Sequence, residues 1–258
     1  MLVLIKKEIL EGIRTYRFLS ILVVLTFFSI LNPVMNKMIL PEILKSQFEG
    51  IEEEMLSQMI ISNQTDCLRA FMGDIFEIGT LVIVLVTAAL IAGERKEKTL
   101  ILPVCSNKKM EDIVLAKNLV YGVFTIICIV LAILIDYLYA GVLFGYDGLE
   151  IGAVIAGGIY IGIYYYMVIS IVMFIGTLLK NTITTALISM LLVYGSNIIA
   201  GFFENGSKSP KGLFDEAMLL SYNMREEIIV PIIVTLSISF LLTVITIIRM
   251  KKLDLVTR

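Results

Sequence analysis

The sequence predicts an all-α membrane protein with six membrane-spanning helices, and three observations support this fold class. Of the 258 residues, 58% are hydrophobic and 17% are charged, whereas a soluble domain has about 25% charged residues. The apolar residues are gathered into six runs with at most one charge each, and each run has about the 20 residues that a helix needs to cross a bilayer. The runs show no alternation of apolar and polar residues, which excludes the strands of a membrane β-barrel.

The six spans leave short connections and two longer outer segments between them. The spans are predicted at about residues 18–36, 75–93, 119–140, 151–179, 183–203 and 228–248. The outer segments cover residues 37–74 and 204–227, and each is expected to contain a short helix, within KSQFEGIEEEMLSQMII in the first and at DEAMLLSY in the second. No linker or repeat divides the chain, so residues 1–258 are predicted to form a single transmembrane domain.

The distribution of basic residues predicts the orientation in the membrane. Fifteen of the 21 lysine and arginine residues lie at the two termini and in the loops 94–117 and 180–182, which share one side of a six-span protein. Loops rich in lysine and arginine stay in the cytoplasm. We therefore expect a multi-pass protein of the cell membrane with both termini in the cytoplasm.

Residues 1–17 are predicted to form an amphipathic helix in the plane of the membrane. One helix face carries the apolar residues Leu2, Ile5, Ile9, Ile13 and Tyr16, and the opposite face carries Lys7, Glu11 and Arg14. A helix with this pattern lies in the membrane interface instead of crossing it. The alternative is an ordinary basic flank of the first span that happens to be helical.

The chemistry of a catalytic site is largely missing. The chain has no histidine, which excludes Ser-His and Cys-His nucleophile pairs and the zinc motif H-E-x-x-H. Residues 201–209, GFFENGSKS, resemble a phosphate-binding loop, but Ser207 separates the glycine from the lysine. We therefore expect no catalytic residue, no metal site and no cofactor on this chain, and no nucleic acid as a partner.

One carboxylate, Asp136, lies inside a predicted span. A carboxylate in a membrane helix is typical of proton- or ion-coupled carriers. Asp136 is about one turn from the outer end of its span, however, and Tyr137 and Tyr139 beside it are typical of an interfacial aromatic belt. We therefore expect Asp136 to reach the lipid headgroups, with the ion-coupled carrier as the alternative.

The fourth span carries a glycine motif and three consecutive tyrosines. Gly158 and Gly162 form a G-x-x-x-G face, which favours close packing of membrane helices, and Tyr164, Tyr165 and Tyr166 follow. Packing within the bundle is the favoured interpretation, and a tyrosine-lined substrate pathway between two subunits is the alternative. The glycine face and the apolar spans also predict a dimer.

The loop between spans two and three is predicted to contain a docking helix. Its sequence, GERKEKTLILPVCSNKKMEDIVLAKN, covers residues 93–118 and places an apolar triplet, residues 100–102, beside charged residues. Pro103 ends this helix, and Ser106 or Asn107 is expected to cap a new helix that continues through Lys117 into span three. A plain loop needs no such triplet, whereas a helix that contacts another protein does.

These residues resemble the signature of type-2 ATP-binding-cassette (ABC) transporter permeases. In that family the second span ends in Gly-Glu-Arg. It is followed by Gly-Thr-Leu, then by a proline with small and basic residues, and then by a helix that ends in Gly-Lys. The matching positions are Gly93, Glu94, Arg95, Thr99, Leu100, Pro103, Ser106, Lys108 and Lys117. Lys98 stands where the family has glycine, and the interval from threonine to proline is shorter by about a turn. The layout of the whole chain also resembles the family.

The resemblance implies a permease subunit of an ATP-driven exporter. Two such subunits form the pathway in the lipid bilayer, as a homo- or heterodimer, and a cytosolic P-loop ATPase subunit that carries the ATP and Mg²⁺ binds the loop. The residues expected to couple to the ATPase are Glu94, Arg95, Thr99, Leu100, Leu102, Pro103 and Ser106. Leu100 and Leu102 would fill a cleft of the ATPase, and Glu94 and Arg95 would form charge pairs at its rim. An ion-coupled secondary carrier and a non-transporting membrane scaffold are the alternatives.

Overall fold

The structure, a computed structural model of the chain, describes residues 1–47, 61–99, 109–202, 206–220 and 228–252. Every regular element among these residues is helical, and none is a strand. Six helices are long and apolar enough to cross a membrane: Arg17–Ile43, Gln64–Lys96, Met110–Phe144, Ile151–Leu178, Thr182–Gly201 and Ile229–Lys252. The predicted number of spans is thus confirmed, and the helices indicate a multi-pass, membrane-embedded protein.

The first two spans are each interrupted by π-helical turns, and the other four are continuous. The first consists of α2 (Arg17–Val34), the π turn η1 (Met35–Ile39) and α3 (Leu40–Gln47). The second consists of α5 (Gln64–Asp74), η2 (Ile75–Gly79), α6 (Thr80–Thr87), η3 (Ala89–Gly93) and α7 (Glu94–Lys96). The remaining spans are α9 (Met110–Phe144), α10 (Ile151–Leu178), α11 (Thr182–Gly201) and α13 (Ile229–Lys252). The shorter elements are α1 (Leu2–Arg14), the 3₁₀ turn η4 (Gly206–Lys208) and α12 (Gly212–Leu219).

Several helices extend beyond the apolar runs from which they were predicted. α5 begins at Gln64, because the side chain of Asn63 accepts a hydrogen bond from the backbone N–H of Asp66 at 2.7 Å and caps the helix. The predicted outer segment 37–74 is therefore helical at both ends, in α3 and α5. The middle of that segment, residues 48–60, lies outside the described residues. The helix predicted at DEAMLLSY corresponds to α12, which begins three residues earlier, at Gly212.

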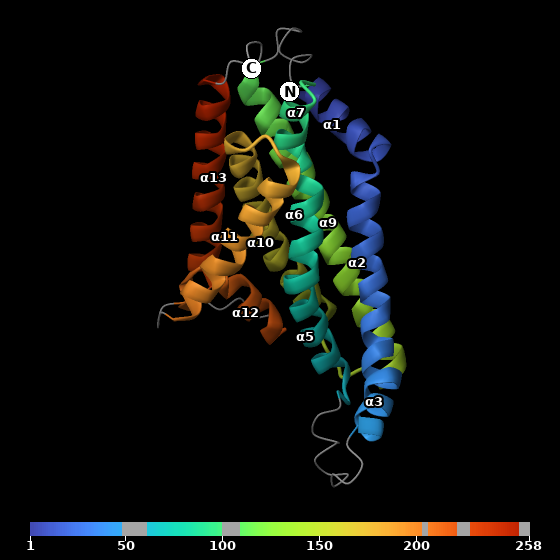
Figure 1. Cartoon of the computed structure of the whole chain (residues 1–258). Coiled ribbons are helices and arrows are strands. Elements are labelled where there is room, and N and C mark those ends of the chain that lie inside the picture. Colours follow the sequence, from blue (N-terminus) through green and yellow to red (C-terminus); the bar gives the residue numbers. More distant parts are fainter. Residues whose placement is uncertain (48–60, 100–108, 203–205, 221–227, 253–258) are drawn as a thin grey trace.

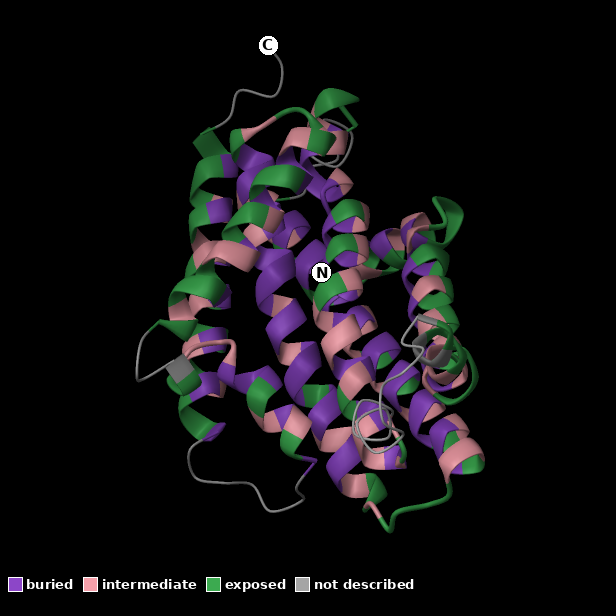
Figure 2. Cartoon of the chain, turned by 60° about the horizontal axis from the view of Figure 1, so that its bottom comes forward, coloured by how far each residue is buried: buried purple, intermediate pink, exposed green. Residues whose placement is uncertain are grey.

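The spans form a bundle around α10. α10 packs against α9, α11, α12, α13 and α6, and Figure 1 shows it in the middle of the bundle with the start of α1 and the end of α13 at the same end of the molecule. We call this the α1 end of the bundle. In Figure 2 the buried positions gather on the inward faces of the helices and the exposed positions on the outward faces. Large apolar side chains such as Leu191 and Phe240 are among the exposed ones, as expected for surfaces that face lipid.

Residues 2–14 form the helix α1, which folds back across the upper ends of α2 and α9 (Figure 1). Its buried residues are Leu4, Glu8 and Gly12. The turn between α1 and α2 passes through Tyr16, which adopts the left-handed conformation with φ of 57°. Gly12 brings α1 onto the ring of Phe18, since a Cβ atom at Gly12 would lie 2.6 Å from that ring. The helical form of residues 2–14 is thus established, and its location in the membrane interface stays a proposal.

The glycine motif of the fourth span packs inside the chain. A Cβ atom at Gly162 would lie 2.9 Å from Ile126, and one at Gly158 would lie 3.1 Å from Val130, both on α9. The face therefore brings α10 close to α9. Because α9 already covers it, this face is not a surface for a dimer contact, which corrects that part of the sequence-based prediction.

Two of the three tyrosines of α10, Tyr164 and Tyr165, lie together with ring centroids 5.4 Å apart, and the third, Tyr166, lies elsewhere, so the three line no common pathway among the described residues. Tyr165 is buried and donates a hydrogen bond to the carbonyl oxygen of Ile75, in the π turn η2, at 2.6 Å. Tyr164 is buried against Phe214 of α12, with ring centroids 4.9 Å apart. Tyr166 lies on another face of α10, where its ring packs over Gly122 of α9. The favoured interpretation, packing within the bundle, describes all three.

Candidate functional site: a buried ion network at the α1 end

Lys117 lies at the centre of a buried group of charged residues that joins three elements. Its side chain is 1% exposed, although it carries a charge. The Lys117 ammonium donates a hydrogen bond to Glu8 of α1 at 2.8 Å and another to Glu94 of α7. Glu8 is 1% exposed and Glu94 is 5% exposed. Buried charges need partners of this kind, because an unpaired charge in a protein interior costs several kcal/mol.

Three further residues extend this group toward the surface. Lys7 lies 2.9 Å from Glu8 and 2.7 Å from Glu11, and Arg17, at the start of α2, lies 3.4 Å from Glu11. We call the six residues Lys7, Glu8, Glu11, Arg17, Glu94 and Lys117 the ion network. Its three carboxylates and three cations balance each other, so the network as a whole is neutral.

The two network residues of α1 that are partly exposed have shifted pKa values. Burial lowers the pKa of Lys7, but its hydrogen bonds to Glu11 and Glu8 outweigh burial and hold the pKa above its ordinary value. Burial raises the pKa of Glu11, but the hydrogen bond from Lys7 and the charge of Lys117 outweigh it and hold the pKa below its ordinary value. Both side chains are therefore charged at neutral pH.

The three carboxylates of the network also come close enough to suggest a metal site. One oxygen from each of Glu8, Glu11 and Glu94 lies within 4.8 Å of the others. The ammonium groups of Lys7 and Lys117 already lie against these oxygens. The positive charge that a metal ion would bring is thus supplied by lysine, and the geometry favours an ion-pair network over a metal centre.

Glu94 is held in the network by the way in which the second span ends. The N–H of Thr99 donates to the carbonyl of Glu94 at 3.0 Å, and the N–H of Lys98 donates to the carbonyl of Arg95 at 3.4 Å. These two bonds form a Schellman motif, in which the residue after the helix adopts a left-handed conformation and is usually glycine. Here Lys98 occupies that position with φ of 60°. The resemblance expects glycine at position 98, and the left-handed backbone of Lys98 is a conformation that glycine adopts easily.

Arg95 fixes the same helix end to the core helix α10. One terminal nitrogen of its guanidinium lies 2.9 Å from the carbonyl oxygen of Gly176, 2.7 Å from that of Thr177 and 3.3 Å from that of Leu179. These carbonyls belong to the last turn of α10, where the helix dipole favours a positive charge. Arg95 therefore caps α10 from the neighbouring span.

α13 completes the connections at the α1 end. Lys251 near the end of α13 forms an ion pair with Glu111 in the first turn of α9, and Arg249 donates to the carbonyl oxygen of Thr177 at 3.5 Å. The segment between Lys96 and Met110 is therefore flanked on both sides by residues that are tied to α1, α10 and α13.

The structure places only some of the residues predicted to contact an ATPase. Both Glu94 and Arg95 were expected to form charge pairs at the rim of the ATPase cleft. Their side chains instead have partners within the chain. Thr99 continues the helix end with a bond from its hydroxyl to the carbonyl of Glu94 at 3.4 Å. Residues 100–108, which include Leu100, Leu102, Pro103 and Ser106, lie outside the described residues. The helix predicted to run through Lys117 into span three is α9, and it begins at Met110.

Asp136 lies in the bundle and does not reach the headgroups, which corrects the sequence-based expectation. The residue is 0% exposed, and neither carboxylate oxygen has a hydrogen-bond partner. The expectation was wrong because α5 extends outward beyond its apolar run and packs along this part of α9. Gln64, in the first turn of α5, donates to the carbonyl of Tyr137, beside Asp136, at 2.8 Å.

The sequence analysis missed the ion network as a unit. Glu8 shares the side of α1 that carries Leu4 and Gly12, all three of which are buried, so a carboxylate beside apolar residues was the available signal. Lys117 gave a second signal, since it lies two residues before an apolar run. Nothing in the sequence connected the two, because 109 residues separate them.

Comparison with known proteins gives the family of the chain and no activity. No curated protein matches the sequence. Residues 56–256, which include Glu94, Lys117 and all spans but the first, match the family described as protein of unknown function (DUF2705). The chain belongs to the DUF2705 family.

Proposed function

We propose that this protein is the membrane-spanning permease subunit of an ATP-driven exporter. In this proposal the spans form the substrate pathway in the cell membrane, both termini lie in the cytoplasm, and the segment from Glu94 to Ser106 binds a separate cytosolic P-loop ATPase. ATP and Mg²⁺ would be held by that ATPase, and this chain would not hydrolyse ATP itself. A second permease subunit, identical or related, would complete the pathway.

The observation that supports this proposal best is the fixation of the segment at both of its ends. Glu94 is its first residue and Lys117 follows it, and Lys117 pairs with both Glu94 and Glu8 of α1. Arg95 links the same place to the end of α10. A segment that receives a movement from a partner must pass it to the membrane helices through rigid contacts, and these contacts provide such a connection.

Co-purification tests the proposal directly. A tagged chain, extracted from its native membrane in mild detergent, is expected to bring down a P-loop ATPase subunit. Leu100→Asp is expected to abolish this association, since truncation of an anchor residue at an interface costs about 2 kcal/mol or more. Ile61→Asp is the matched control, because it places the same charge in the connection that precedes α5, at the other end of the bundle, and is expected to leave the association intact. If the Leu100→Asp variant retains its full complement of ATPase, the segment is not the docking site.

A second candidate function, an ion-coupled carrier, is favoured by one observation. Asp136 is a fully buried carboxylate without a hydrogen-bond partner, and an ionised carboxylate in such a place costs several kcal/mol. A proton held there would neutralise it and provide the exchangeable group that a carrier needs. Hydrophobic carbodiimides react with protonated carboxyl groups in apolar surroundings. Labelling of Asp136 that declines as the pH rises, and that Asp136→Asn removes, supports this candidate, and no labelling at any pH argues against it.

A further inference from the structure

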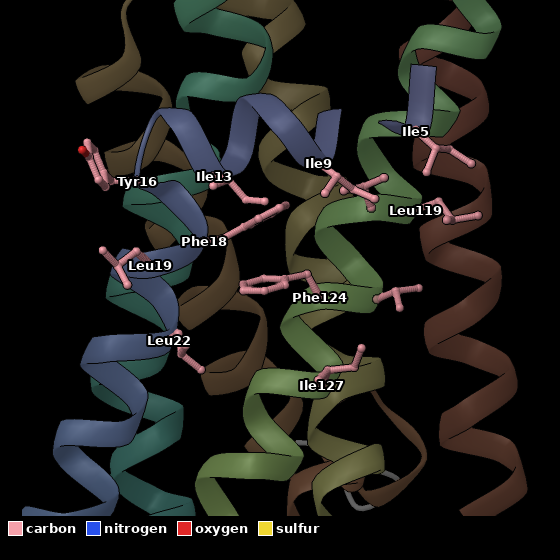
Figure 3. Close-up of a pocket in the computed structure, with 12 residues that line it drawn as sticks. Ile5, Ile9, Ile13, Tyr16, Phe18, Leu19, Leu22, Leu119, Phe124 and Ile127 are labelled. Carbon is pink, nitrogen blue, oxygen red and sulfur yellow. The ribbon is translucent and has the colours of Figure 1, made fainter. Parts of the chain in front are cut away.

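A groove lies beneath α1, outside the ion network. It has a volume of about 580 Å³. Figure 3 shows its walls: α1 forms the roof with Ile9 and Ile13, the first turns of α2 form one side, and α9 forms the other side with Phe124 and Ile127. The rings of Phe18 on α2 and Phe124 on α9 stack at 4.1 Å between centroids and so join the two sides of the groove. The volume is within the range of about 300–1,000 Å³ that is typical of ligand sites.

The chemistry of the lining suits a hydrocarbon chain. Of the twelve residues that line the groove, Tyr16 alone carries a polar side-chain atom. An ordered water needs two to four polar partners, and the groove offers almost none. The occupant must therefore be apolar over most of its length.

The groove opens sideways, toward the membrane. On α9 the exposed residues Leu119, Val123 and Ile127 are four positions apart and form one stripe of the wall. The same stripe continues below the groove with the exposed residue Leu131. An acyl chain can enter from the bilayer without passing through the core of the bundle.

One basic residue on α1 indicates the charge of the headgroup. Lys6 is exposed and lies three positions before Ile9 and seven before Ile13, so it flanks the face of α1 that lines the groove. Among the described residues Lys6 forms no ion pair, whereas Lys7 and Arg17 are engaged with Glu8 and Glu11. Arg14 is also exposed, but it lies on the opposite face of α1 and points away from the groove.

We propose that this groove is a binding site for an anionic phospholipid, with one acyl chain beneath α1 and the phosphate beside Lys6. The bound chain supports α1 from below and so holds Glu8 in position against Lys117. The site requires a bilayer and does not depend on an ATPase or on transport, so its test is independent of the proposed function.

Photo-crosslinking of the full chain in lipid nanodiscs tests the position of the acyl chain. The probe is phosphatidylglycerol with a diazirine at the end of one acyl chain, and mass spectrometry of peptides locates the adducts. Adducts are expected to gather on residues 5–16 and 119–127, in excess over residues 131–142. Val123→Trp and Ile127→Trp fill the groove and are expected to remove this excess. Leu131→Trp and Leu138→Trp on the exposed side of α9 are the matched controls and are expected to preserve it.

A second arm tests the headgroup. Lys6→Gln is expected to lower labelling by the phosphatidylglycerol probe about fivefold, since a basic residue near an anionic surface contributes about that factor. Arg14→Gln, on the opposite face of α1, is the matched control and is expected to leave the labelling nearly unchanged. Labelling by the corresponding phosphatidylcholine probe is expected to be weaker and insensitive to both changes. Equal labelling by the two probes overturns the anionic site, as does an even distribution of adducts along α9. Cross-linking of two copies through Val123→Cys would show that a second copy occupies the groove, and it also overturns the proposal.

Discussion

Lys117 donates a hydrogen bond to Glu94, and this contact joins the start of one membrane helix to the end of the helix before it. Glu94 is the last buried charged residue of the second span, and Lys117 is the first of the third span. Lys117 also donates to Glu8 of α1. Because both helices enter the intervening segment from a fixed point, the segment has a defined attachment to the membrane domain. This attachment leads to the first prediction.

Removing Lys117 is expected to destabilise the protein strongly. Lys117→Met leaves Glu8 and Glu94 buried without their shared cation, and loss of one partner of a buried pair costs about 3–5 kcal/mol. The melting temperature in detergent, followed by circular dichroism, is expected to fall. Glu8→Gln and Glu94→Gln, added together to the Lys117→Met background, remove the unpaired charges and are expected to restore most of the loss. Lys252→Met, an exposed position on α13, serves as the control. Equal melting temperatures for the Lys117 and Lys252 variants would show that the network does not stabilise the fold.

Lys98→Gly is expected to stabilise the chain. Lys98 adopts a positive φ, a conformation that costs a residue with a Cβ atom about 1–2 kcal/mol, and glycine avoids this cost. The neighbouring change Lys96→Gly has the opposite effect, because Lys96 lies in the last helical turn and glycine there costs up to about 1 kcal/mol. Thermal unfolding of both variants checks the sign. A loss of stability on Lys98→Gly would contradict the Schellman motif.

Gly162→Ala is expected to lower stability without changing the oligomeric state. The added methyl group meets Ile126 of α9 at 2.9 Å, so α9 and α10 must separate. Gly195→Ala in α11 is the control, since no atom lies within 4 Å of the added Cβ and alanine favours the helix by up to about 1 kcal/mol. Thermal unfolding and the mass of the detergent-solubilised protein by light scattering measure the two effects. A Gly162→Ala variant that dissociates without loss of thermal stability would indicate that this face belongs to an interface between subunits.

The ion network is expected to weaken in acid and to persist at neutral pH. The pKa of Glu11 is lowered in the folded protein, so its contribution is complete above its ordinary pKa of 4.5 and is lost as the pH falls through the lowered value. The pKa of Lys7 is raised, so its contribution is lost only as the pH rises far into the alkaline range. Melting temperatures measured from neutral pH to below pH 4.5 should decline at the acid end. Glu11→Gln should lower stability at neutral pH and flatten this decline, and an unchanged decline in that variant would exclude Glu11 as its source.

The orientation of the chain is tested by labelling single cysteines. In a background without Cys67, Cys105 and Cys128, a cysteine at the exposed position Ser62 is expected to react with a membrane-impermeant maleimide in intact cells. A cysteine at Lys109, at the α1 end of the bundle, is expected to react only after the membrane is opened. Labelling of the Lys109 position from outside would reverse the proposed orientation.

The six spans were predictable because the hydrocarbon selects apolar residues wherever a helix crosses it. The ends of the helices were not predictable in the same way. α5 extends to Gln64 because Gln64 bonds to Tyr137 of α9 and both Gln64 and Thr65 bond to Asp147 just after α9, and this packing cannot be inferred from hydropathy. For the same reason Asp136 was assigned to the headgroups although it lies inside the bundle.

The candidate site was predictable only in part. The charged residues around Glu94 and Arg95 were identified as important from their position beside a span and from the resemblance of the segment. Their partners could not be identified, because the contacts with Lys117, Glu8 and the end of α10 depend on how the helices pack. The sequence thus locates a candidate region, and tertiary packing decides which charges face inward.

The π turns of the second span have a consequence for tracing the evolution of the family. A π turn contains one residue more than an α-helical turn, and one residue corresponds to a rotation of about 100°. At η2 the hydroxyl of Tyr165 donates a hydrogen bond to the carbonyl oxygen of Ile75, the first residue of the turn. A relative whose second span lacks this π turn must have one residue fewer at that place. Otherwise the residues on the two sides of the turn no longer face the bundle as they do here. DUF2705 proteins that lack one of these turns are therefore expected to align with a single-residue gap inside the second membrane helix, at residues 75–79 or 89–93, and an alignment that forbids such gaps will assign the wrong residues to the core.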